Sequence, residues 1–436
     1  MAPSDPSLLR ALQHQLSAHS DAPALWLGLS GGLDSMLLLD LLAELTSTST
    51  CPPLRAIHVH HGLHPLADQW AALCVRACAR YGVPLQVERV VLARQASIEE
   101  AARDARYAVY ERLLGPGDLL LLAQHADDQL ETLIFRALRG AGLRGLAGMP
   151  RQRPLGRGHL LRPLLDVSRA ELETAAHQRN LQWVEDPANA DPRFARSWLR
   201  HTALPALRRQ WPQTDRSLLR LAGHVAEAGA LLDELAEADM GALAHVDTDP
   251  WLKQWPALQL PGLRRLSAPR QRNLLRGWLL AQGCRLPDQR HLLALQQQFD
   301  RGSTAGLRWE IDDACVLGGV EQLWLLPAGG MPAGQSEPLP DVAELRLSGG
   351  NGLLRQSGER PSGEWQIRYR TGGELIRMAG RPTQTLKKLF QEAGIPAWLR
   401  PAVPLIHYQG ELVSVGGRWQ AANAPASWCV HWFPAG

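Results

Sequence analysis

Lysine is almost absent from this chain of 436 residues, since it occurs only at positions 253, 387 and 388. The 46 basic residues are therefore nearly all arginines, and against 43 acidic residues they leave a net charge of +3. A total this small identifies no partner. Arginine binds phosphate in bidentate geometry better than lysine does, so only local arginine clusters carry information about binding.

Cysteine is also sparse: there are six cysteines and no Cys-x-x-Cys pair. Cys74 and Cys78 lie four apart in a predicted helix with apolar neighbours, which favours buried thiols over a metal or redox pair. The sequence shows no signal peptide and no run of about eighteen apolar residues. We therefore expect a cytoplasmic protein with no membrane partner.

A single core is not expected, because 436 residues exceed what one domain usually contains. Strands are predicted at 23–30, 54–62, 85–92 and 115–125, and helices follow them from Asp34 and at 67–82, 97–114 and 127–140. Capping boxes, Ser97 with Glu100 and Ser168 with Glu171, open two helices. The alternation predicts an α/β domain with a parallel sheet and helices on both faces.

Composition predicts four segments along the chain. The α/β pattern covers residues 1–212, and 213–330 read as mainly helical. Proline and glycine thicken over 331–352, which is typical of a linker. Residues 353–436 mix short strands with one predicted helix at 383–394, as in a small α+β domain.

Three polar segments fall where predicted strands end: SGGLDS (30–35), HVHHGLH (58–64) and AQHADDQ (123–129). Ligands of parallel α/β sheets bind beyond the carboxyl ends of the strands. The coincidence of the three segments predicts a binding site there.

The segment SGGLDS lacks the Gly-Lys-Ser/Thr ending of a Walker A loop, so no lysine reaches a nucleotide's outer phosphates. A glycine-rich turn can still hold a pyrophosphate on its backbone amides, with Asp34 near a Mg²⁺ ion. The alternative is an ordinary turn capped by Asp34 or Ser35. The candidate phosphate loop is Ser30, Gly31, Gly32, Leu33, Asp34 and Ser35.

A strand, SGGxDS, a helix and an HVHHGL-like segment after the next strand resemble the PP-loop ATP pyrophosphatases. Within these enzymes the chain resembles the tRNA(Ile)-lysidine synthetase family. The segments that carry this resemblance stand in family order at 101–107 (AARDARY), 125–149, 161–172, 185–196 (EDPANADPRFAR) and 386–406.

The resemblance implies a PP-loop domain for residues 1–212 and two tRNA-binding domains, at 213–330 and 353–436. It implies a ligase that uses ATP and Mg²⁺ to adenylate the C2 oxygen of the wobble cytidine in the isoleucine tRNA with anticodon CAU. L-lysine then displaces AMP and leaves lysidine. A homodimer stays open as the oligomeric state.

Two residue groups suit this chemistry. Arg103 and Arg106, three apart on one helix face, are expected near the phosphates or the tRNA backbone; a solvated helix face is the alternative. A lysine substrate needs carboxylates around its ammonium group and a base to take its proton. Asp128 and Glu131 are the candidates for both roles, with Asp127 beside them, although carboxylates at a helix N-terminus are also favoured without any ligand.

The remaining candidates are weaker. The histidines of 58–64 could contact adenine or ribose, and a metal site is less favoured because no cysteine or carboxylate is close in sequence. An arginine run after 192 has phosphate contact and a solvated helix face as equal alternatives, and it contains Arg193, Arg196, Arg200, Arg208 and Arg209. In the last domain tRNA contact is expected at Lys387, Lys388 and Arg400, whereas core packing is the preferred role for Trp398 and Trp419.

The sequence departs from the family pattern at His61, Gln124 and Ser197. Three alternative functions remain at this stage. A PP-loop tRNA thiolase would commonly carry a Cys-x-x-Cys pair, which is missing. An ATP-using synthetase acting on a small molecule would not need arginine-bearing additional domains. A module that binds ATP or RNA without catalysis would bind without releasing pyrophosphate.

Overall fold

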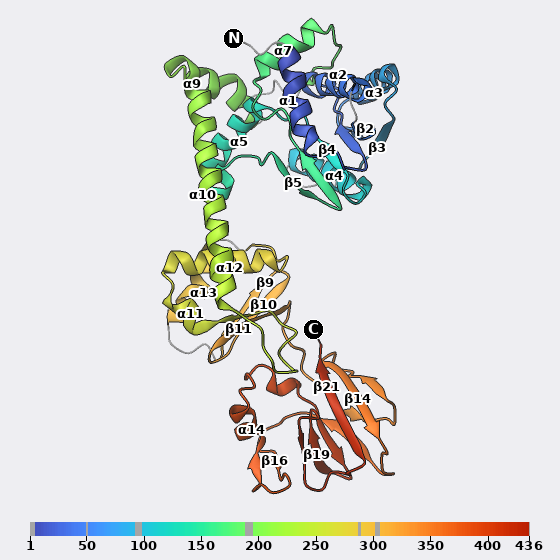
Figure 1. Cartoon of the computed structure of the whole chain (residues 1–436), viewed down its shortest axis with the longest axis vertical. Coiled ribbons are helices and arrows are strands. Elements are labelled where there is room, and N and C mark those ends of the chain that lie inside the picture. Colours follow the sequence, from blue (N-terminus) through green and yellow to red (C-terminus); the bar gives the residue numbers. More distant parts are fainter. Residues whose placement is uncertain are drawn as a thin grey trace. The chain divides into compact units, whose positions relative to one another are not determined.

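The computed structural model describes residues 5–48, 51–91, 98–187, 195–286, 289–300 and 306–435. It divides into two compact units, residues 1–229 and 230–436, and the division falls within the long helix α10 (Thr214–Leu243) (Figure 1). The predicted capping serine Ser97 and the candidate Arg193 lie outside the described residues.

The first unit is built on a six-stranded sheet in the order β3-β2-β1-β4-β6-β5. Five of the strands run parallel, and β5 pairs antiparallel with β6 at one edge. The predicted parallel α/β sheet is therefore confirmed. The strands are β1 (Leu25–Gly28), β2 (Leu54–His60), β3 (Leu85–Arg89), β4 (Leu119–Leu121), β5 (Gln152–Leu155) and β6 (Gly158–Leu161).

Helices cover both faces of this sheet, because successive residues of a strand point to opposite sides. Leu25 and Leu27 of β1 pack with the helices of one face, whereas Trp26 packs with Val109 and Tyr110 of α4 on the other. Each fully buried leucine contributes roughly 1.5–3 kcal/mol. The first face carries α1 (Asp5–Ser17), α2 (Leu33–Thr48), α3 (Ala67–Tyr81) and α7 (Arg169–Gln178), and the second carries α4 (Ile98–Leu113).

Local sequence signals set several helix ends as predicted. Helix α3 stops before Gly82, which adopts the left-handed conformation that favours glycine. At the start of α7 the capping box forms: the Glu171 backbone N–H donates to Ser168 Oγ at 3.3 Å, and Glu171 Oε2 accepts from the Ser168 N–H at 2.8 Å. The described part of the unit also contains α5 (Ala126–Leu138), α6 (Leu143–Leu146), α8 (Ala195–Trp198), the π-helix η2 (Leu199–Ala203) and α9 (Leu204–Gln210).

The strand order creates a crevice beside β1. The chain passes from β1 to β2 and β3 on one side of the sheet, and then returns to place β4 on the other side of β1. At such a reversal the helices that follow the strands diverge, which leaves space outside the strand ends. The segments that follow β1, β2 and β4 are the three polar segments.

The second unit begins with helices packed on a five-stranded antiparallel sheet of order β7-β8-β11-β10-β9. The helices agree with the predicted helical middle region, whereas the sheet was not predicted. The elements are α11 (Leu260–Arg265), α12 (Ala268–Ala281), α13 (Gln289–Asp300), β7 (Ala244–His245), β8 (Ala257–Gln259), β9 (Arg308–Ile311), β10 (Ala314–Gly318) and β11 (Gln322–Pro327).

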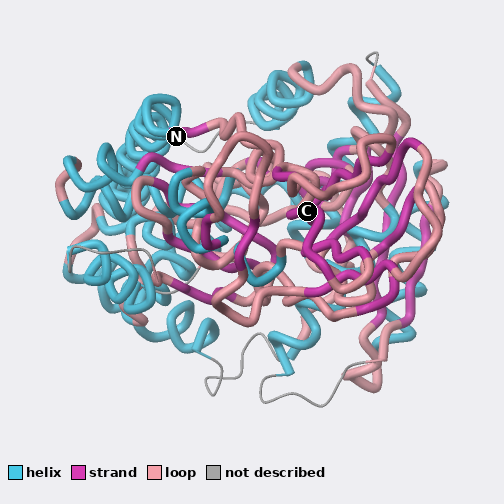
Figure 2. Tube along the Cα trace, turned by 90° about the horizontal axis from the view of Figure 1, so that it is seen from below, coloured by secondary structure: helices cyan, strands magenta, loops and turns pink. Residues whose placement is uncertain are grey.

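The remaining chain forms antiparallel sheets of five, three and two strands, drawn as arrows in Figure 1 and as magenta tube in Figure 2. The predicted helix at 383–394 is present as α14 (Leu386–Glu392). The range predicted as a linker contains β12 (Glu337–Pro338) and β13 (Glu344–Arg346), and the four-segment division stays a prediction. The other elements are β14 (Gly352–Gly358), β15 (Trp365–Arg368), β16 (Leu375–Ile376), β17 (Gln384–Thr385), η3 (Arg400–Ala402), β18 (Leu405–Tyr408), β19 (Glu411–Val415), β20 (Trp419–Gln420) and β21 (Trp428–Pro434).

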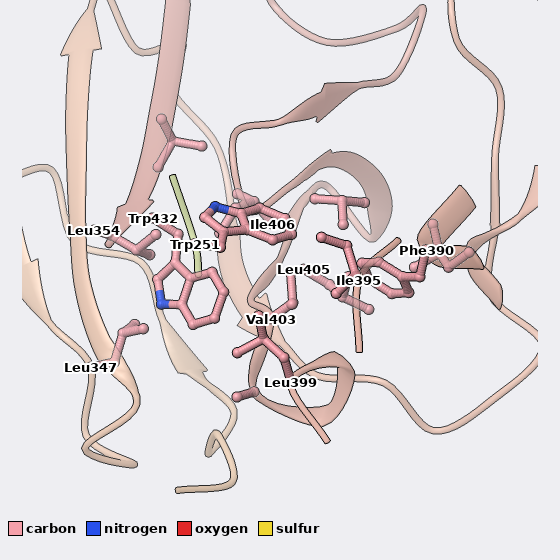
Figure 3. Packing of buried hydrophobic residues seen from close by; sticks show 14 of the residues in the cluster. Trp251, Leu347, Leu354, Phe390, Ile395, Leu399, Val403, Leu405, Ile406 and Trp432 are labelled. Carbon is pink, nitrogen blue, oxygen red and sulfur yellow. The ribbon is translucent and has the colours of Figure 1, made fainter. Parts of the chain in front are cut away.

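Tryptophans form much of the core in this part of the chain. Trp251 meets Trp432 edge-on with ring centroids 5.2 Å apart, amid buried aliphatic side chains such as Leu354 (Figure 3). Trp398 packs on Trp324 and Trp419 on Trp251, at 5.6 and 5.8 Å. Both rings therefore serve packing, which was their preferred role. Among the residues described, no helix combines the length and apolarity needed to cross a bilayer.

Candidate active site

Hydrogen bonds of two serine side chains fix the conformation of the loop between β1 and α2. The Ser30 and Ser35 hydroxyls lie 3.0 Å apart, and Ser35 Oγ also accepts from the Ser30 N–H at 3.2 Å and donates to the Gly32 carbonyl. Gly31 has a φ of +88°, and its carbonyl accepts from the Val184 N–H. This geometry turns the chain directly into helix α2, whose first-turn amides can bind an anion.

Gly31→Ala should damage this loop. Alanine at positive φ costs about 1–2 kcal/mol, and its Cβ would lie 3.2 Å from Cys74 Sγ and 3.3 Å from Val184 Cγ2. We expect a lower free energy of unfolding and a KM for ATP raised about tenfold, measured by denaturant titration and by pyrophosphate release. Gly32→Ala is the stability control, because a Cβ there meets its nearest neighbour at 3.5 Å. Equal losses of stability would contradict this account of the loop.

A cavity of about 370 Å³ lies at the carboxyl ends of β1, β2 and β4. It brings together all three polar segments that the sequence analysis singled out. Of the candidate loop, Ser30, Asp34 and Ser35 line the cavity, whereas the Leu33 side chain is buried in the core. Other lining residues are His58, His60, His61, His64, Trp70, Arg103, Arg106, Tyr107, Tyr110, Gln124 and Asp128.

Helix α4 supplies the cationic wall of this cavity. Arg103 and Arg106 both line it, and the Arg103 guanidinium lies 4.8 Å from the centre of the Tyr107 ring. Burial lowers the pKa of His61 to about 4, and the charge of Arg106 lowers it in the same direction. The ring is therefore neutral near pH 7. Arginines beside neutral rings suit a nucleotide, which carries both phosphates and an aromatic base.

Within the described parts of the chain, no three His, Cys, Asp or Glu side chains are grouped to hold a metal ion. His58 is buried, and its Nδ1 lies 2.8 Å from the Leu29 carbonyl oxygen, which joins β2 to the phosphate loop.

Asp34 lies at the start of α2 with one carboxylate oxygen paired and the other unpaired. Its Oδ2 accepts from Arg169 Nη1 at 2.7 Å and lies 3.8 Å from His125 Nε2. Its Oδ1 is buried and has no hydrogen-bond partner among the residues described. Burial raises the pKa of Asp34, against the opposing charges of His125 and Arg169. A buried unpaired carboxylate oxygen beside a phosphate loop is the donor that Mg²⁺ prefers, so Asp34 fits a magnesium site.

Asp128 and Glu131 share one cation. Arg200 Nε donates to Glu131 Oε1 at 2.6 Å, and Arg200 Nη2 donates to Asp128 Oδ1 at 3.3 Å. The Glu131 side chain is only 1% exposed, whereas Asp128 is 20% exposed and lines the cavity. Burial raises the pKa of Glu131, although the Arg200 hydrogen bond opposes the shift. The one guanidinium of Arg200 thus bridges the two carboxylates, and of the pair Asp128 lines the cavity.

Asp127 points away from this pair. Its carboxylate accepts from the Arg169 backbone N–H at 2.8 Å and from Arg208 Nη2 at 2.6 Å. Burial alone would raise the pKa of Asp127, but these two donors lower it below its ordinary value. The Asp127 carboxylate therefore links α5 to α7 and α9, and it does not line the cavity.

The remaining candidates are dispersed. Arg196 is exposed on α8, and its charge acts on Glu131 without a described hydrogen bond between them. Lys387, Lys388 and Arg400 belong to the second unit. There Lys388 pairs with Glu392 at 3.8 Å, and Arg400 Nε donates to the Ile395 carbonyl at 2.9 Å. Phosphate or tRNA contact by these residues stays a prediction.

Two residues of the site were missed by the sequence reading. Arg169 pairs with Asp34, and His125 lies between Asp34 and Asp128. Arg169 follows the capping serine Ser168, and His125 lies within the AQHADDQ segment, although neither was singled out. The divergent Gln124 accepts a hydrogen bond from Arg162 and lines the cavity, while Ser197 is buried on α8.

Cys74 and Cys78 are buried thiols, as the sequence predicts. All six are free, and burial raises the pKa of Cys74 to about 12 and that of Cys78 to about 11. Because the thiolate is the reactive form, we expect neither thiol to react with iodoacetamide near neutral pH until the protein unfolds. Mass spectrometry of labelled peptides measures this. Rapid labelling of either cysteine in the native protein would reopen the thiolase alternative.

Comparison with known proteins identifies first the class and then the family. Residues 6–207 match the PP-loop domain family. Two further segments match domains of one kind of PP-loop protein: 258–320 match the TilS substrate binding domain and 365–432 the TilS substrate C-terminal domain.

Full-length relatives agree with these domains. The tRNA(Ile)-lysidine synthase of Pseudomonas aeruginosa is 46% identical over 442 residues, which cover 99% of this chain and 98% of that protein. The enzyme of the same name from Pseudomonas syringae pv. tomato is 44% identical, over 99% of this chain and 97% of that protein. The one from Methylococcus capsulatus is 41% identical, over 93% of this chain and 95% of that protein. The chain belongs to the tRNA(Ile)-lysidine synthase family.

Proposed function

We propose that the chain ligates L-lysine to C2 of the wobble cytidine in the isoleucine tRNA with anticodon CAU, using ATP and releasing AMP and pyrophosphate. Family membership supports the reaction class. The observation that carries the proposal is one cavity whose walls include both the phosphate loop and Asp128, with Glu131 buried behind it on the same helix. An ATP site and an amine site beside one cavity suit two successive steps, adenylation of the C2 oxygen and then attack of the amine on C2.

In the first step the cytidine C2 oxygen attacks the α-phosphorus of ATP, and pyrophosphate leaves. Negative charge grows on the phosphate oxygens, so fixed donors stabilise the transition state without reorganising. The backbone amides of the phosphate loop hold the departing pyrophosphate, and Arg103 and Arg106 face it from α4. Asp34 would hold Mg²⁺, which neutralises phosphate charge when it is bound.

In the second step the lysine ε-amino nitrogen attacks C2. The new C2–N bond forms, the C2–O bond breaks, and the oxygen leaves on AMP. The ammonium group must first lose a proton, and we assign the binding of the ammonium and the acceptance of that proton to the carboxylates of Asp128 and Glu131. The raised pKa of Glu131 suits a proton acceptor.

The proposed substrate also assigns roles to the basic residues outside the cavity. Arg196 in the first unit and Lys387, Lys388 and Arg400 in the second are proposed to contact tRNA phosphates. Because tRNA is the substrate, we place the enzyme in the cytoplasm. A homodimer is compatible with this reaction, although the described chemistry needs only one copy.

Radiolabelled L-lysine, ATP, Mg²⁺ and the CAU-anticodon isoleucine tRNA test the proposal directly. Label should enter the RNA only when every component is present, and a tRNA with uridine at the wobble position should take up none. ATP turnover to AMP with tRNA but without label would refute lysine ligation and retain a PP-loop enzyme. Binding without any pyrophosphate release would refute both.

A further inference from the structure

Arg200 fills the subsite that the proposed reaction assigns to the lysine amine. Its guanidinium bonds both carboxylates, Glu131 at 2.6 Å and Asp128 at 3.3 Å. A guanidinium in this position presents to the two carboxylates the same charge and N–H donors that a lysine ammonium would bring. The Glu131 side chain is 1% exposed, so leaving its carboxylate without a cation would cost free energy.

We propose that Arg200 is a displaceable internal counter-ion, which occupies the amine subsite until the substrate ammonium takes its place. This inference rests on the proposed function, because it identifies the subsite with lysine. The exchange swaps one cation for another, so the buried Glu131 keeps a cationic partner throughout and the net charge of the subsite does not change. Arg200 is therefore a positioning residue, and it sets the affinity for lysine without touching the reacting atoms.

The surroundings of Arg200 fit a group that leaves its place. The side chain is 35% exposed, so an outward path to solvent exists, in contrast to the buried Glu131. It lies on the five-residue π-helix η2, a form that is rare and frequently found at functional sites. Its two partners, Asp128 and Glu131, are the carboxylates that the proposed reaction assigns to the lysine ammonium.

Arg208 provides the contrast. It also bonds a carboxylate of α5, Asp127, but it bonds Asp215 as well at 2.9 Å. Asp127 does not line the cavity. Lysine entering the subsite would take both partners from Arg200 and none from Arg208, so the two arginines form a matched pair for experiment.

Removal of Arg200 should therefore tighten the binding of lysine. We would measure dissociation constants by calorimetry on the full chain, with L-lysine and with cadaverine, a diamine that lacks the carboxylate. Arg200→Gln should lower both constants about tenfold, and Arg200→Met should do the same if the glutamine variant folds poorly. Arg200→Lys, which keeps the charge, should stay close to the wild-type values. Arg208→Gln should leave both constants unchanged.

Two results would overturn the inference. If Arg200→Gln weakens lysine binding but not cadaverine binding, the guanidinium binds the carboxylate of the substrate. If the variant melts at a lower temperature with both dissociation constants unchanged, Arg200 only stabilises the packing of α5. In either case wild-type lysine transfer to tRNA would still support the proposed function, whereas a wild-type protein that neither binds nor transfers lysine would overturn both.

Discussion

Asp34→Asn is expected to lower the rate of tRNA-dependent pyrophosphate release at least about a thousandfold. The substitution keeps the shape of the side chain but removes the negative charge that the phosphate loop presents to the cavity. It also leaves Arg169 and His125 without the carboxylate that now lies 2.7 and 3.8 Å from them. The rate is measured with saturating tRNA and ATP, and the Mg²⁺ concentration for half-maximal rate should rise.

Asp40→Asn is the matched control for this variant. Asp40 lies on the same helix, pairs with Arg179 and Tyr81, and does not line the cavity. Both substitutions remove a carboxylate paired with an arginine, so both variants should lose stability, but Asp40→Asn should retain catalysis. An Asp34→Asn enzyme that keeps more than about a tenth of the wild-type rate would remove Asp34 from the phosphate chemistry.

Glu131→Gln should separate the two steps. Glutamine has nearly the same volume and can still accept a hydrogen bond from Arg200, but it cannot accept a proton from the lysine ammonium. General-base catalysis contributes about 10²–10⁴-fold, so lysine transfer should fall by that factor while adenylation of the tRNA continues. The measurement is a single turnover with labelled ATP and labelled lysine, which follows adenylated tRNA and lysine-bearing tRNA separately.

Two further variants complete this test. Asp128→Asn identifies which carboxylate accepts the proton, because the stronger loss of transfer marks the base. Glu171→Gln, in the capping box of α7, is the control outside the cavity and should affect only stability. Equal losses of adenylation and transfer in Glu131→Gln would contradict a role confined to lysine.

Most of the first unit could be predicted from sequence because its signals are local. Apolar runs alternate with amphipathic helices, and Gly82 and Ser168 mark helix ends through their own backbone and side-chain chemistry. The sheet of the middle region could not be predicted in this way. Its strands include β7 with two residues and β8 with three, too short to show any alternation of apolar and polar side chains.

The difference between local and long-range signals also explains which parts of the site could be predicted. The cavity followed from parallel strands, whose carboxyl ends bring SGGLDS, HVHHGLH and AQHADDQ to one edge of the sheet. The arginine partners did not follow from the sequence, since Arg169 is 135 positions from Asp34 and Arg200 is 69 from Glu131. Arg200 and Arg208, weighed as phosphate contacts or a solvated face, bond carboxylates of α5, and their contact with phosphate stays a prediction. No local pattern marks a pair that only the tertiary fold brings together.

The central claim is that the cytidine C2 oxygen is adenylated and leaves on AMP. It is tested most directly by placing a heavy oxygen isotope at C2 of the wobble cytidine, running the complete reaction with L-lysine, and weighing the AMP released. The account predicts one heavy oxygen atom in the AMP for each lysine attached to the tRNA. AMP without the heavy isotope, with the label retained in the RNA, would contradict it.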